Sequence, residues 1–301
     1  MRVLVALLSA AVLAVTVACS HTDPSTRPYG AQAAKVGESV AVLGFNIGLS
    51  NLRWEGKHVL VDVDAAPSQP GKPHAKPEEL RFGLYGALAH PIEANGIGSC
   101  REVANLAIRP LAAPNPDRVT GTVCLGQIED QSQVRGIYVY SPRDRIPGSA
   151  SAYPVAFPVG ALPTNENDTG GLVVKTTSVE AWRGDGAQVS PQQLGDPAVF
   201  TGNGYLLLGL AASGVAARYR DESERRGGPM MIVVSPTLPE GQGLSHACAA
   251  YGASVLVLPD AKLGAVQVNA SVCTQGEINE ALLYATLSVV GTHAAVWTTR
   301  D

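Results

Sequence analysis

The 301-residue chain predicts an all-β protein made of two tandem β-sandwich domains. Short apolar runs recur between clusters of Gly, Pro, Asn and Asp, and Val61 and Val63 alternate with Asp62 and Asp64 as in a strand with one exposed face. About seven such runs per roughly 125 residues are typical of a β-sandwich. Convincing long helices are missing from the pattern. Two cysteine pairs of similar spacing indicate that one unit is used twice.

The N-terminal segment predicts export and a lipid anchor. Arg2 precedes an uncharged run over residues 3–18, which is typical of a secretory signal peptide and shorter than the about 20 residues of a spanning helix. The end of this run, Thr16-Val-Ala-Cys19, resembles the lipobox of bacterial lipoproteins, although Thr16 stands where an aliphatic residue is usual. The resemblance implies that residues 1–18 are removed and that Cys19 carries diacylglycerol. An ordinary signal peptide that happens to end in cysteine is the alternative.

Residues 19–38 are expected to form the lipidated cysteine and a flexible tether, because they contain prolines, few apolar residues and no periodicity. The formal net charge is −4, and no basic stripe points to nucleic acid. No polybasic cluster follows the anchor, so contact with the membrane would depend on the acyl group. Abundant Ala, Gly and Val resemble the composition of proteins from GC-rich actinobacteria. The expected location is the extracytoplasmic face of the plasma membrane.

The repeat sets the expected domain limits, which are 39–162 and 171–301 with a linker at 163–170. An offset of 148 residues places Cys100 on Cys248. The second unit inserts a polar stretch over residues 185–203, which predicts a surface loop. The same offset aligns 58–62 with 206–210, 82–86 with 230–234 and Pro91 with Pro239, and Trp54-Glu-Gly56 resembles Trp182-Arg-Gly184.

The same offset decides how one ambiguous segment is interpreted. Residues 211–226 could be helical at their charged end, but they correspond to the Pro-rich loop over 66–79, so we expect a loop. Its run Arg218-Tyr-Arg-Asp-Glu-Ser-Glu-Arg-Arg226 is expected to be solvated, with contact to a partner as an alternative. The strands expected in the first domain are 40–52, 58–65, 80–88, 103–109, 118–126, 134–141 and 151–159.

A pair of motifs carries a resemblance to a known class of domain. They are Asp117-Arg-Val-Thr-Gly-Thr-Val-Cys124 and the following Gly136-Ile-Tyr-Val-Tyr-Ser-Pro142. With the strand pattern, they resemble the telokin-like, immunoglobulin-fold domains of exported actinobacterial proteins, including secreted mycobacterial antigens. The resemblance implies two immunoglobulin-like sandwiches that serve as surface interaction or structural modules without chemistry. Fold alone does not fix function.

The remaining four cysteines predict two disulfides. Cys100 and Cys124 lie 24 positions apart, and Cys248 and Cys273 lie 25 apart. Exported proteins occupy compartments that permit disulfides. Each bridge would stabilise its domain by roughly 3 kcal/mol in the chain-entropy model. These spans are short for an antibody-type bridge, so we expect each to join neighbouring strands or a strand to a loop.

The remote alternative is an enzyme. Ser245-His-Ala-Cys248 resembles the Ser-His-Gly-Cys nucleophile motif of L,D-transpeptidases, which are cell-wall enzymes. A nucleophilic cysteine needs a neighbouring base, yet no histidine occurs between His90 and His246. Ala247 also replaces the glycine of that motif. Gly243-Leu-Ser-His-Ala247 imitates a serine-hydrolase elbow, but all-β patterning removes the strand-to-helix turn that this elbow needs.

Neither the paired aspartates nor the histidines are expected to form a functional site. Asp62 and Asp64 would share one face of a strand, and a solvated face is favoured over a paired-carboxylate site. The histidines are scattered, at positions 21, 58, 74, 90, 246 and 293, so a zinc site is not expected. The sequence therefore predicts no catalytic residue, metal or cofactor.

Apolar strands in the second unit provide the best indication of function. Runs such as 230–234 and 255–258 are apolar on both faces, whereas a strand exposed on one face should alternate. The first domain, a partner protein or an apolar ligand could cover the extra face. We therefore expect a non-catalytic adaptor, adhesin or wall-associated scaffold that contacts an envelope protein or cell-wall component. The alternative is a carrier of an apolar ligand in the second domain.

Intact mass and a non-reducing peptide map of the mature protein, alkylated before reduction, test these predictions. We expect acyl mass on Cys19 and the bridges Cys100–Cys124 and Cys248–Cys273. Alkylation of Cys248 as a free thiol would contradict the second bridge and reopen the transpeptidase hypothesis.

Overall fold

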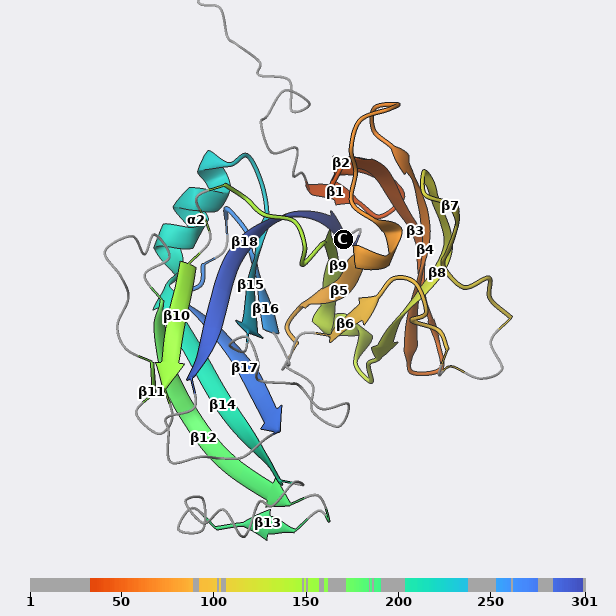
Figure 1. Ribbon diagram of the computed structural model, residues 1–301. Helices are drawn as coiled ribbons and strands as arrows, with labels where there is room; N and C mark the ends of the chain where they lie inside the picture. Colours follow the sequence, from red (N-terminus) through yellow and green to blue (C-terminus); the bar gives the residue numbers. More distant parts are fainter. Residues whose placement is uncertain are drawn as a thin grey trace, which may run out of the picture.

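A computed structural model of the chain is drawn in Figure 1. Antiparallel strands make up most of the part that it describes, so the predicted β class is confirmed. No helix in this part is long and apolar enough to cross a membrane. The described residues are 33–88, 92–101, 103, 107–147, 149, 151–156, 160–161, 172–183, 185, 187–190, 204–237, 253–260, 262–275 and 284–299.

The first unit comprises residues 33–147 and the end of the last strand. Its five-stranded sheet has the order β2-β3-β4-β8-β7, and β5, β6 and β9 lie in the facing sheet. In β3, the buried Phe45, Ile47 and Leu49 alternate with more exposed residues and pack into a core shared with Phe82. The bounds are β1 (Ala33–Lys35), β2 (Ser39–Val42), β3 (Phe45–Glu55), β4 (His58–Pro67), η2 (Pro77–Glu79), β5 (Arg81–Gly86), β6 (Ile92–Asn95), β7 (Ala112–Asn115), β8 (Arg118–Gln127), η3 (Gln131–Gln133) and β9 (Val134–Tyr140).

The second unit contains most of the remaining described residues. One sheet has the order β13-β12-β14-β17, and the other contains β10, β11, β15, β16 and β18. Val266, Val268 and Ala270 of β17 are buried and alternate with exposed residues, which is the pattern of a strand that covers a core. The bounds are β10 (Ser151–Ala156), β11 (Gly160–Ala161), β12 (Val173–Arg183), β13 (Gln188–Val189), β14 (Gly204–Val215), α2 (Ala216–Arg225), β15 (Met230–Thr237), β16 (Ala253–Val257), β17 (Ala265–Gln275) and β18 (Tyr284–Thr298).

The last strand, β18, belongs to both units. Its residues 284–293 pair with β10 and β15, whereas residues 294–298 pair with β9 and, at their end, in parallel with β1. Trp297 is fully buried in the first core, and its Nε1 donates to the carbonyl oxygen of Glu38 at 3.0 Å. Figure 1 shows β18, in dark blue, running from the green and blue unit into the orange and yellow one.

This pairing can be compared with the expected domain limits. Limits of 39–162 and 171–301 assign β10 to the first domain and β18 to the second. In the structure β10 pairs with β18 in the sheet of the second unit, while the end of β18 completes the first unit. The expected linker, 163–170, lies outside the described residues.

Strand pairing repeats between the units. β3, β4 and β8 have the same order as β12, β14 and β17. Leu60 lies opposite Cys124, and Leu208 lies opposite Val272, so both strands follow the offset of 148. The offset does not extend to the edge strands β6 and β16. In the first unit β6 pairs with β5 and precedes Cys100, whereas in the second unit β16 pairs with β15 and follows Cys248.

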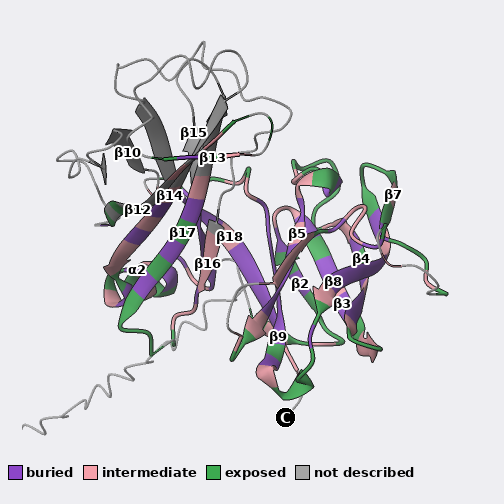
Figure 2. Ribbon diagram, turned by 90° about the horizontal axis from the view of Figure 1, so that it is seen from below, coloured by how far each residue is buried: buried purple, intermediate pink, exposed green. Residues whose placement is uncertain are grey.

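Both faces of β15 are buried. Met231 and Val233 pack with Tyr138 and Tyr140 of β9, while Ile232 is buried on the opposite face. Of the three covers considered for the apolar face of this strand, the first unit is the one observed. Figure 2 shows buried positions in purple along β18 and β9, where the two units meet.

A polar network also crosses this boundary. The Glu93 carboxylate accepts hydrogen bonds from the hydroxyls of Tyr138 at 2.6 Å and Tyr140 at 2.8 Å, and from the Ser254 hydroxyl. Burial, followed by the negative charge of Glu93, raises the pKa of both tyrosines, so they remain protonated donors. The network therefore joins β6, β9 and β16 with matched donors and acceptors.

Two predicted strands of the first unit need correction. The run 40–52 is not one strand, because Leu43 and Gly44 both have positive φ and form a two-residue hairpin turn between β2 and β3. The expected strand at 103–109 is also wrong where it is described: residues 103 and 107–109 lie outside strands, and an isolated bridge joins Pro110 to Thr122.

The segment 211–226 is not a loop, because β14 continues through Val215 and helix α2 follows. Ala216, Tyr219 and Ser223 are buried at helical spacing, and Glu222 binds Arg225 and Arg226 at i+3 and i+4. Prolines interrupt the corresponding loop of the first unit, which contains no α-helix, whereas residues 211–226 contain no proline. The stretch expected as a loop at 185–203 likewise contains β13.

Replacing Trp297 with alanine tests the dependence of the first unit on β18. The variant removes a fully buried indole and is expected to lower the free energy of unfolding by about 3–5 kcal/mol in urea titrations. Leu263→Ala, at an exposed position, should change it by less than about 0.5 kcal/mol. Equal effects of the two variants would contradict this role of β18.

Candidate functional site

A bulge in β3 builds the candidate site. The pairing of β3 with β4 shifts between Ser50 and Arg53, and Asn51 adopts a positive φ of 50°. Odd-numbered residues face the core before the bulge, but after it Trp54 packs against the core while Arg53 reaches Asp62. The bulge thus reverses which side chains at the end of the strand face the core. Bulges are common beside functional sites. Asparagine is among the few residues that tolerate this conformation.

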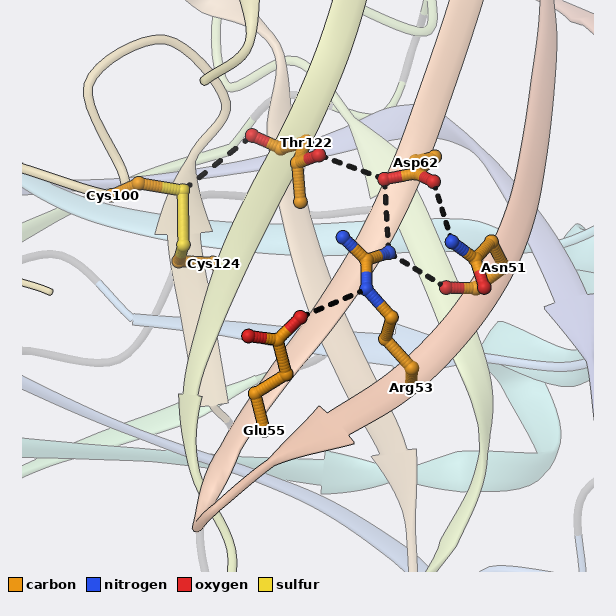
Figure 3. Close-up of polar contacts among 7 residues, drawn as sticks. All are labelled: Asn51, Arg53, Glu55, Asp62, Cys100, Thr122 and Cys124. Carbon is orange, nitrogen blue, oxygen red and sulfur yellow. Dashed lines mark hydrogen bonds and ion pairs between the residues drawn. A yellow bond between two sulfur atoms is a disulfide. The ribbon is translucent and has the colours of Figure 1, made fainter. Parts of the chain in front are cut away.

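Asp62 holds the bulge in place. One carboxylate oxygen accepts from Asn51 Nδ2 at 2.8 Å, and the other accepts from Arg53 Nη1 at 3.0 Å and Thr122 Oγ1 at 2.8 Å. Arg53 also donates to Glu55 at 3.3 Å and to the carbonyl oxygen of Asn51 at 3.0 Å. Figure 3 shows these side chains converging from β3, β4 and β8.

The Asp62 carboxylate is thereby kept ionised. Burial raises its pKa, but hydrogen bonds from Asn51, Thr122 and Arg53 together outweigh burial, so the pKa is lowered. Both oxygens are engaged, so Asp62 is suited to hold the bulge rather than to exchange protons with a substrate. Asp64 lies on the same strand face but binds Arg118 separately, so the two carboxylates do not form one catalytic pair.

A cavity of about 670 Å³ that is widely open to solvent adjoins the bulge. It opens where the ends of β3 and β9 approach the residues that follow β1 and β18. The Nε1 of Trp54 is buried and has no hydrogen-bond acceptor in the described part of the chain. Apolar walls come from Val36, Leu52, Trp54 and Val134, with polar groups on Asn51, Gln131, Ser132 and Thr299.

These properties suit the cavity to binding. Ligand sites commonly measure about 300–1,000 Å³ and combine apolar walls with a few fixed polar groups. The unpaired Trp54 N–H is shielded from solvent and costs about 1–3 kcal/mol of stability, so Trp54 contributes apolar ring surface to the wall. We call this cavity the Trp54 pocket.

A second cavity, of about 420 Å³, lies where the units meet. His293 donates its backbone N–H to Asp144 Oδ2 at 2.7 Å, and its ring Nδ1 lies 2.6 Å from the same oxygen. Burial raises the pKa of Asp144, but the contacts with His293 lower it overall. His74 also lines this cavity, and its ring nitrogens contact the carbonyl oxygen of Ala75 and the carboxylate of Asp117. Ionisable side chains line this crevice, whereas the residues that line the Trp54 pocket include none.

The predicted site residues fall in different places. Cys100 and Cys124 form a disulfide with Cα atoms 5.1 Å apart, beside the buried Leu60. Cys273 lies in β17 opposite Leu207. Cys19 and Cys248 lie outside the described residues, as do the motifs at 243–247 and 245–248. The predicted anchor, second bridge and transpeptidase alternative therefore stay predictions.

Sequence reasoning missed Asn51, Trp54 and the pocket that they line. Ser50-Asn51 does interrupt the apolar run, and this polar pair before Trp54 is the signal available. No protein family model, curated protein or solved structure matches the chain. Within the described residues, no group of three or more His, Cys, Asp or Glu side chains could hold a metal ion.

The lowered pKa of Asp62 makes its contribution to stability depend on pH. Asp62→Asn is expected to lower the free energy of unfolding at pH 7 by about 1–2 kcal/mol. Because the folded pKa lies below 3.8, the wild-type contribution is present above 3.8 and is lost as pH falls through the folded value. The difference in unfolding free energy between the wild type and Asp62→Asn, measured in urea titrations, should therefore shrink towards pH 2.

Asp64→Asn is the matched control, since Asp64 lies on the same face and its side chain is 60% exposed. It should change stability by less than about 1 kcal/mol. A penalty for Asp62→Asn that stays constant with pH would contradict the electrostatic role of Asp62.

Proposed function

We propose that this protein is a lipid-anchored envelope module that acts by binding and not by catalysis, and that its units are tandem immunoglobulin-like sandwiches. Support for the sandwiches comes from facing antiparallel sheets and the matching strand orders of the two units. Support for the anchor comes from the sequence Thr16-Val-Ala-Cys19. The cell envelope is the proposed location.

The Trp54 pocket is the observation that carries the proposed binding function. Its bulged wall is held by Asp62, so the pocket is formed before a ligand arrives and little ordering entropy is lost on binding. The last residues of the expected tether, 19–38, form β1 and pair with β18, and Val36, directly after β1, lines the pocket. A tethered protein would therefore present this pocket at its anchored end.

The pocket also indicates the chemistry of the partner. Leu52, Val36 and Val134 favour an apolar side chain or segment. The polar groups of Asn51, Gln131 and Ser132 favour one that also brings a hydrogen-bonding carbonyl or hydroxyl. An envelope protein or a cell-wall component that presents such a group is the proposed partner.

An apolar-ligand carrier is the alternative function. It was expected in the second unit because of strands with two apolar faces, but Tyr138 and Tyr140 cover Met231 and Val233 of β15. The observation that now favours a carrier is the volume of the Trp54 pocket in the first unit. A carrier would hold an extractable lipid there.

Photocrosslinking in intact envelopes tests the proposal. A photoreactive phenylalanine at Ser132, in the pocket wall, should give a discrete protein or wall adduct, whereas the same residue at exposed Asn46 should not. Trp54→Phe removes the N–H and keeps an aromatic ring. This variant should raise the free energy of unfolding by about 1 kcal/mol, because it removes a buried unpaired N–H, and should reduce the adduct about tenfold, because the smaller ring removes part of the apolar wall.

The outcomes separate the two functions. An adduct that forms equally at Ser132 and Asn46, or that Trp54→Phe leaves unchanged, would rule out the pocket as the binding site. Extractable lipid together with a lipid adduct at Ser132 would favour the carrier.

A further inference from the structure

The free edge of β17 is the starting observation. β17 is 11 residues long, and among the described strands it pairs with β14 alone. Its counterpart β8 has both edges occupied, by β4 and by β7. The connection from β16 to β17 spans only residues 258–264, whereas 96–117 lie between β6 and β8 and include β7. Within the described residues, the second unit thus has no strand at the place that β7 takes in the first.

Several other sheet edges are protected in ways that β17 is not, although the shorter edge strand β16 also lacks charge, proline and glycine. Proteins commonly prevent edge-to-edge pairing with charges, proline, bulges or very short strands. β12 carries Lys175 and Glu180 and has a bulge, β7 contains Pro114, and β11 and β13 have two residues each. β17 contains no charged residue, proline or glycine, and its pairing with β14 runs without a shift. An edge of this kind is a template for another strand.

The pattern of β17 fits pairing with itself. Full antiparallel overlap of two copies places Ala270 opposite Ala270 of the second copy. Each odd-numbered residue then lies opposite an odd-numbered residue of the other copy, and each even-numbered residue opposite an even-numbered one. The face with buried Val266 and Val268 therefore continues across the pair, and so does the face with exposed Gln267 and Asn269. Figure 2 shows this alternation of buried and exposed positions along β17. No like charges meet, because the strand has none.

We propose that β17 pairs antiparallel with β17 of a second copy of this chain, giving a two-fold symmetric dimer with a sheet that continues from β12 of one copy to β12 of the other. Such an interface uses the same surface on both copies and closes after two, so it does not propagate into a filament. The dimer does not depend on the proposed function, because the Trp54 pocket lies in the first unit.

Sedimentation of residues 20–301, which include every described strand, tests this proposal. The wild-type chain should pass from monomer to dimer within about 1–500 μM. Asn269→Lys places a charge on the exposed side of β17 next to the two-fold axis and should weaken dimerisation at least about tenfold. Asn46→Lys makes the same charge change at an exposed position of β3 and should leave dimerisation unchanged.

A second variant tests the register independently of affinity. Full overlap places Asn269 opposite Ser271 of the other copy, so Asn269→Cys with Ser271→Cys should give a covalent dimer under mild oxidation. The matched pair Asn46→Cys with Gly48→Cys on β3 should not. A chain that stays monomeric at 500 μM, or a dimer unaffected by Asn269→Lys and not trapped by the cysteines, would overturn the proposal.

Discussion

The placement of Trp297 in the core of the first unit is the constraint on which the rest of the structure depends. This residue lies near the end of the chain, yet it packs with residues of β3 and β5. To reach that core, β18 must run from the second unit into the first, and it pairs with β10 and β15 along one part and with β9 and β1 along the other. Two hydrogen-bonded ladders therefore fix one unit against the other.

This shared strand explains the composition of the boundary. Once β18 crosses, the outer face of β9 lies against β15, and both strands need a second apolar face. Tyr138 and Tyr140 meet this need because their rings cover Met231 while their hydroxyls reach Glu93. Protonated tyrosines and an acceptor carboxylate satisfy one another at this partly buried boundary. The boundary thus resembles a domain core more than a mobile hinge.

The Trp54 pocket follows from a different local conflict. A β3 strand without a bulge would keep odd-numbered residues facing the core and would point Trp54 outward. The positive φ of Asn51 reverses the alternation, and the Asp62 carboxylate holds this conformation. Backbone strain held by surrounding contacts is typical of functional sites. Leu43, another residue with positive φ, lines the crevice between the units.

The sequence by itself determined the β class, the repeat that aligns β4 with β14 and β5 with β15, and the pairing of Cys100 with Cys124, because alternation, turn residues and spacing are local properties. Local pattern misled at 211–226, where the Pro-rich counterpart hid the helical spacing of Ala216, Tyr219 and Ser223. The apolar run 40–52 likewise gave no sign of the turn at Leu43, since leucine rarely adopts positive φ. Only the tertiary structure decided that β18 serves both units, that Asp62 meets Asn51 and Thr122, and that the Trp54 pocket forms. Those features join residues far apart in the chain, and which distant strands pair is set by the packing of the whole core rather than by any one segment.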